Sequence, residues 1–73
     1  MNLHWRQAVY FTGFVAHYGP YRFEIRFHAL KHIALRVYRE FDPSHCLHAW
    51  NARSVRDAKG QAQAFLRNPH GSN

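Results

Sequence analysis

The clearest alternation of apolar and polar side chains lies in residues 21–27 (YRFEIRF). Four apolar residues alternate strictly there with Arg22, Glu24 and Arg26, and the turn-forming pair Gly19-Pro20 stands immediately before them. A period of two predicts a half-buried β-strand with one apolar face and one charged face. Aromatic residues and arginine are therefore interleaved on this strand.

The preceding residues, 5–18, are rich in aromatic and β-branched side chains and predict a first strand. Gly13 interrupts this strand, which indicates a bulge or a close approach of another backbone segment. Because Gly19-Pro20 supplies turn chemistry between the two stretches, the sequence predicts an N-terminal antiparallel hairpin.

Residues 27–41 (FHALKHIALRVYREF) fit two structures. Apolar residues at positions 27, 30, 34, 37 and 41 have the spacing of an amphipathic helix. Positions 33, 35 and 37 instead alternate, which predicts a third strand at 33–41 after a short turn at 29–32. That turn contains no Gly, Pro, Asn or Asp, so the local pattern favours the helix.

The C-terminal third predicts a helix at 54–67. The triplet Asp42-Pro43-Ser44 is expected to break the chain, and residues 46–50 fit a short strand or a turn of helix. Ser54 and Asp57 then match the capping pattern of a helix start, and an apolar stripe follows. The prediction is one α+β domain over residues 1–67, followed by a flexible tail at 68–73.

Length and composition limit the classes of protein to which this chain can belong. The 73 residues allow one small domain, and a homodimer would enlarge its limited core. One cysteine excludes an internal disulfide, no apolar run reaches the length of a membrane span, and the N-terminus lacks the apolar region of a secretory signal. We therefore expect a cytoplasmic protein with no membrane contact.

Ten Lys and Arg against four acidic residues give a formal charge of +6, and eight of the ten are arginine. Arginine binds phosphate and carboxylate with a planar fork and stacks on rings, so this bias indicates an anionic partner. Two basic groups are candidates, the strand row with its neighbours and the surroundings of the C-terminal helix. The predicted binding residues are Arg22, Glu24, Arg26, Arg36, Arg39, Arg53, Arg56 and Lys59.

The sequence gives weaker evidence for a catalytic or metal-binding site than for a binding surface. The four acidic residues each have an ordinary structural explanation, so no catalytic residue, metal or cofactor is predicted. Seven histidines leave one alternative, a zinc-binding module. Its ligands would be His28, His32, Cys46 and His48, although their spacing matches no standard zinc signature.

Residues 54–62 (SVRDAKGQA) are similar to the S-x-x-[DE]-A-K-x-x-A helix that closes many small phage and prophage proteins. In that group an early Trp, an aromatic strand, a G-x-Y hairpin and a further strand precede the helix. Trp5, Tyr10-Phe11, Gly19-Pro20-Tyr21 and residues 33–41 follow the same order. The resemblance spans most of the chain through short motifs, and it implies a βββα domain in which 33–41 is a strand.

Small phage proteins of this kind include accessory DNA-associated proteins and inhibitors of host defence, among them anti-CRISPR proteins. The resemblance implies a non-catalytic inhibitor or modulator of a host nucleic-acid machine, acting by surface occlusion in the host cytoplasm. Its partner would be a host protein or nucleoprotein complex. Many such inhibitors are acidic mimics of nucleic acid, whereas this chain is basic. Sequence-nonspecific binding of DNA or RNA is therefore the alternative.

Overall fold

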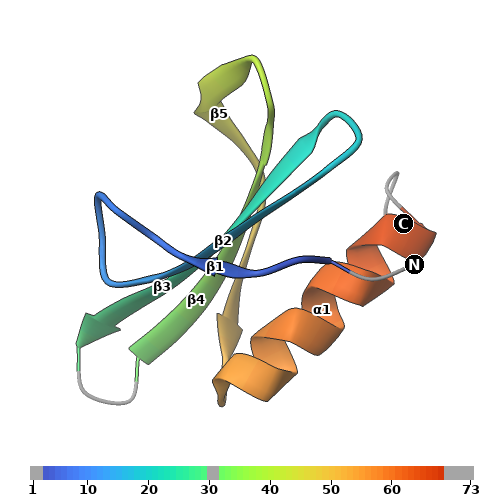
Figure 1. Cartoon of the computed structure of the whole chain (residues 1–73). Helices are drawn as coiled ribbons and strands as arrows, with labels where there is room; N and C mark the ends of the chain where they lie inside the picture. The colour runs from blue at the N-terminus through green and yellow to red at the C-terminus, as the bar shows by residue number, and fades with distance from the viewer. Residues whose placement is uncertain (1–2, 30–31, 69–73) are drawn as a thin grey trace.

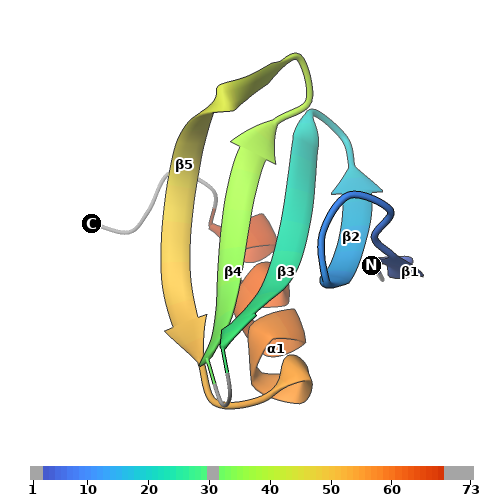
Figure 2. The same ribbon diagram turned by 90° about the vertical axis from the view of Figure 1, so that its left-hand side faces the viewer.

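The fold is an antiparallel sheet with one helix packed across one of its faces. The computed structural model describes residues 3–29 and 32–68, and within them the strands follow chain order across the sheet. The elements are β1 (Arg6–Gln7), β2 (Gly13–Tyr18), β3 (Tyr21–Ala29), β4 (His32–Arg39), β5 (Asp42–Ala52) and α1 (Val55–Arg67). Figure 1 shows α1 on one side of the sheet, and Figure 2 looks onto the other side, which we call the open face. The predicted α+β class is confirmed, with more strand than expected.

The N-terminal hairpin is present, but its first strand is shorter than predicted. Residues 5–18 divide into β1 and β2, and the chain leaves the sheet between them. A hydrogen bond of 3.0 Å from the Ala8 N–H to the Gly13 carbonyl closes this excursion. Gly13 has φ of 149°, and a Cβ there would overlap the carbonyl oxygen of Ile25. The predicted close backbone approach at Gly13 is therefore confirmed, and it allows β2 to begin against β3.

Residues 33–41 are a strand for most of their length, so the helix interpretation is wrong. β4 pairs with β3 on one edge and with β5 on the other. The helical stripe leaves out Leu35, which is fully buried, and includes Phe41, which is 76% exposed. The strand alternation of Ile33, Leu35 and Val37 matches the core instead. Residues 30–31 of the predicted turn lie outside the described residues.

The expected chain break at residues 42–44 is also wrong, because β5 begins at Asp42. The turn residues act in another way. Arg39 of β4 pairs with Asp42 of β5, and the neighbouring residue Tyr38 pairs with Cys46. Residues 43–45 of β5 therefore have no partner on β4, and the register shifts there. The result is an irregular tip on a continuous strand.

The C-terminal helix confirms the prediction closely. The Ser54 hydroxyl accepts a 3.0 Å hydrogen bond from the Asp57 N–H, and the Asp57 carboxylate accepts one of 3.0 Å from the Arg53 N–H. This reciprocal pair satisfies backbone donors at the helix start. Asn68 ends the helix, and the remainder of the predicted tail, 69–73, lies outside the described residues. No helix in the described ranges is long and apolar enough to cross a membrane.

The core lies between α1 and the odd-numbered side of β3. Phe23 and Ile25 are fully buried, together with Leu35 and Val37 of β4. Phe65 of α1 sits among aromatic rings, 5.9 Å from Phe23 between ring centroids. Because residues alternate across a strand, burying the odd-numbered positions of β3 places its even-numbered positions on the open face.

Candidate binding face

The open face has a cluster of arginines at its centre. Arg22, Glu24 and Arg26 lie on β3, and β4 places Arg36 directly beside Glu24. We call these four residues the arginine cluster. Three positive charges and one negative charge leave it with a net charge of +2. The cluster joins two strands, so it depends on their register as well as on the alternation within β3.

Glu24 is buried at the centre of this cluster, with 4% of its surface exposed. One carboxylate oxygen lies 3.0 Å from an Nη nitrogen of Arg22, and the other accepts a 2.8 Å hydrogen bond from Nε of Arg26. The side chains of Arg22 and Arg26 are 23% and 32% exposed. The predicted charged face of β3 is therefore only partly exposed, because the two arginines fold over the Glu24 carboxylate.

Aromatic rings hold the same arginines from other directions. The guanidinium carbon of Arg22 lies 4.9 Å from the centroid of Tyr38, and that of Arg26 lies 4.2 Å from the centroid of Phe11. A side-chain hydrogen bond to Tyr38 raises the pKa of Arg36 above its ordinary value. Ion pairs and cation–π contacts together fix the direction of the guanidinium groups.

A large hollow borders the cluster on the side of β1 and β2. Residues 6–11 form its outer wall, and its floor is formed by Val15, His17, Arg22, Glu24 and Arg26. Its volume is about 700 Å³, and we call it the corner hollow. The connection between β1 and β2, blue in Figure 1, projects away from α1 and so creates the wall. Tyr10 on this wall is 96% exposed.

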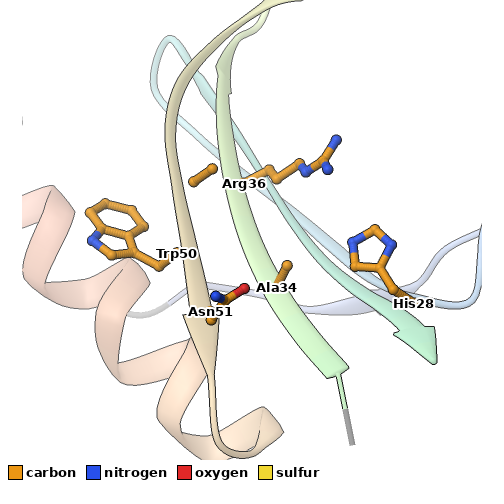
Figure 3. A pocket seen from close by; sticks show the side chains of 6 residues that line it. His28, Ala34, Arg36, Trp50 and Asn51 are labelled. Carbon is orange, nitrogen blue, oxygen red and sulfur yellow. The ribbon is translucent and has the colours of Figure 1, made fainter. Parts of the chain in front are cut away.

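A smaller hollow of about 330 Å³ borders the cluster on the side of β4 and β5. Ala34 and Ala49 contribute short side chains to it, and Arg36, His28 and Asn51 also line it. Figure 3 shows His28 and Arg36 on one side of the sheet, whereas Trp50 points towards α1 on the other. We call this the alanine hollow. The arginine cluster thus lies between two depressions of the open face.

The other predicted binding residues lie elsewhere. Arg39 is exposed at the end of β4, opposite Tyr21. Arg53 and Arg56 are exposed at the start of α1, and Lys59 lies further along that helix with its Nζ 5.8 Å from the ring of Phe14. Since α1 covers the opposite side of the sheet, these residues do not extend the arginine cluster.

Sequence reasoning missed the aromatic residues of the open face. The sequence predicts Tyr10 and Phe11 within the first strand, and it predicts Tyr38 within a helix or strand without a binding role. Gly13 is the one local sign that Tyr10 and Phe11 lie outside the strand. The strand β2 begins at this glycine, where the backbone approaches β3 closely, and residues 8–12 precede it. No comparable local signal marks Tyr38, whose partner Arg22 is distant in sequence.

The structure does not bring the proposed zinc ligands together. His32 begins β4, whereas Cys46 pairs with Tyr38. Six residues of strand separate these positions, about 20 Å at ~3.3 Å per residue. His48 instead stacks on Trp50, with ring centroids 4.7 Å apart. Among the described residues, no group of three or more His, Cys, Asp or Glu side chains could hold a metal ion.

Comparison with known proteins gives no relative from which a function could be transferred. No protein-family model matches the chain, and no curated protein or solved structure matches it significantly. The functional argument therefore depends on the geometry of the open face.

Proposed function

We propose that this chain is a small, non-catalytic binding protein that uses its open face to occlude a surface of a host nucleic-acid machine. The arginine cluster is the observation that carries this proposal. Its guanidinium groups are held by Glu24, Tyr38 and Phe11, yet Arg22 and Arg26 keep part of their surface exposed. Oriented cations of this kind suit an acidic partner, because fewer side-chain motions are lost on binding.

The rim of the open face supports a macromolecular partner. Tyr10 is 96% exposed on the wall of the corner hollow, and Phe41 is 76% exposed in the turn between β4 and β5. In Figure 1 both connections project to the side away from α1. Exposed aromatic residues beside arginine are the composition found at interface hot spots.

The proposal of a phage-type inhibitor rests on the resemblance of residues 54–62 to the closing helix of small phage proteins. An anti-CRISPR-like protein would act in the host cytoplasm on a protein or nucleoprotein complex. The charge of +6 favours a partner with an acidic surface, such as nucleic acid or a protein that presents carboxylates. A homodimer would present two such faces.

Capture from a bacterial lysate, with and without nuclease, tests this function. The wild-type chain is compared with Arg36→Gln, which removes one charge from the open face, and with Arg56→Gln, which removes one from α1. We expect a component of a nucleic-acid complex, identified by mass spectrometry, to be retained by wild type and by Arg56→Gln. Arg36→Gln should retain about tenfold less, as expected for a loss of about 1.4 kcal/mol. Equal retention by both variants would contradict the assignment to the open face.

Direct, sequence-nonspecific nucleic-acid binding is the second candidate, favoured by the exposed ring of Tyr10 beside the cluster. In that case nuclease treatment removes the captured material, and affinity falls steeply as salt rises. A partner that survives nuclease treatment assigns the open face to a protein surface.

A further inference from the structure

We infer that the two hollows and the arginine cluster form a track for single-stranded nucleic acid, with one base held against Tyr10 in the corner hollow. This inference rests on the proposed function, because it requires the open face to be the binding surface. It specifies the polymer, its path across the strands and the side chain that stacks on it.

The path follows from the positions of the hollows. The corner hollow lies over β2 and β3, the alanine hollow lies over β4 and β5, and the arginine cluster lies between them. Neighbouring strands are about 4.8 Å apart, so a chain crossing from β2 to β5 covers roughly 14 Å. Volumes of about 700 and 330 Å³ both fall in the range of sites that bind small molecules. The hollows can therefore receive successive nucleotides.

The cluster provides partners for phosphate between the hollows. A guanidinium group has five N–H donors, and Glu24 engages only one nitrogen of Arg22 and one of Arg26 at short range. Nε of Arg22 is buried, so phosphate can reach only the exposed part of that guanidinium group. The buried Glu24 carboxylate thus fixes one edge of each guanidinium group, and the exposed donors can bind phosphates of the nucleic-acid backbone.

The aromatic residues favour a single strand over a duplex. Tyr10 exposes nearly its whole surface on the wall of the corner hollow, next to Phe11, whose ring contacts Arg26. Stacking of one base on an aromatic ring contributes about 1–3 kcal/mol. The bases of a duplex are already stacked on each other, so a duplex could use only the arginines.

Fluorescence anisotropy with labelled oligothymidine of about 12 nucleotides tests the track, because binding sites of this kind cover about 4–16 nucleotides. A duplex of equal length is the comparison. We expect tighter binding of the single strand. If the three arginines neutralise three phosphates, log K against log salt has a slope of about −2, and Arg36→Gln makes it shallower by about 0.7.

Two aromatic variants separate stacking from charge. Tyr10→Ala should weaken binding of the single strand by about 5- to 160-fold, following the stacking range above, and should leave the duplex affinity unchanged. Tyr18→Ala is the matched control, because Tyr18 is a partly exposed aromatic residue outside both hollows. Circular dichroism confirms that each variant folds.

Equal affinity for single strand and duplex, or no effect of Tyr10→Ala, would overturn the track. The failure of the broader proposal gives a different result. If oligothymidine does not bind while Arg36-dependent capture survives nuclease, the open face binds protein and only the track is wrong. If neither oligothymidine nor a lysate component binds, both proposals are wrong.

Discussion

Replacing Glu24 with glutamine should lower the stability of the fold and raise its affinity for anions. Glu24 is the buried carboxylate to which both Arg22 and Arg26 turn. Glutamine has nearly the same shape but removes the negative charge, and one of its two polar atoms becomes a donor that faces an arginine. The substitution therefore tests the arginine cluster with little change in volume.

The expected loss of stability follows from two charge-assisted contacts of 2.8 and 3.0 Å. A hydrogen bond to a charged group contributes about 1.5–3 kcal/mol. Arg22 and Arg26 retain 23% and 32% side-chain exposure, so water replaces part of each lost contact. Glutamine also keeps one acceptor oxygen. We expect a net decrease of about 2 kcal/mol in the free energy of unfolding, which lowers Tm by about 8–16 °C in a domain of this size.

Urea unfolding followed by tryptophan fluorescence measures the stability difference. Glu40→Gln is the matched control, because it changes the net charge equally but alters an exposed carboxylate that contacts His17. The cluster's charge rises from +2 to +3 in Glu24→Gln, so oligothymidine should bind more tightly, whereas the slope of log K against log salt, which is set by the three arginines, should stay at about −2. If Glu24→Gln unfolds at the same urea concentration as Glu40→Gln, the buried ion pairs do not stabilise the fold and the reasoning fails.

Substitutions at three positions test the backbone and the helix start by the same urea assay. Gly60→Ala should stabilise the protein by about 1 kcal/mol, because Gly60 lies in α1 with open space around an added Cβ. Gly13→Ala should destabilise the protein by about 3 kcal/mol or more, because the added Cβ would overlap the Ile25 carbonyl and the φ of 149° disfavours a side chain. If Gly60→Ala and Gly13→Ala change the free energy of unfolding in the same direction, this account is wrong. Ser54→Ala should lose about 1 kcal/mol of capping energy, whereas Ser54→Thr should retain most of it.

Sequence patterns predict the structure correctly where it depends on residues that are close together in the chain. The alternation in residues 21–27 predicted both the strand and its buried side, and Ser54 with Asp57 predicted the helix start. The stretch 33–41 was ambiguous because its apolar residues satisfy both periods. Pairing of β4 with strands on both edges decides between them, and no local pattern contains that pairing.

The open face was harder to predict because its contacts join distant residues. Glu24 is buried only when the register places Arg36 beside it and both neighbouring arginines turn inward. Phe11 reaches Arg26 only because residues 8–12 leave the sheet. The sequence therefore predicted which charged residues share a strand face, but not that they form a cluster or that a hollow lies on each side of it.

Glu24 also explains how three arginines can occupy adjacent positions of one sheet. Like charges on neighbouring cross-strand positions destabilise a sheet, and Arg36 on β4 lies between the levels of Arg22 and Arg26 on β3. A carboxylate at the centre offsets this repulsion, and its burial strengthens each contact by excluding water. The same carboxylate weakens the attraction of the face for phosphate. A variant that lacks Glu24 should therefore bind anions more tightly than the wild-type chain and should also be less stable.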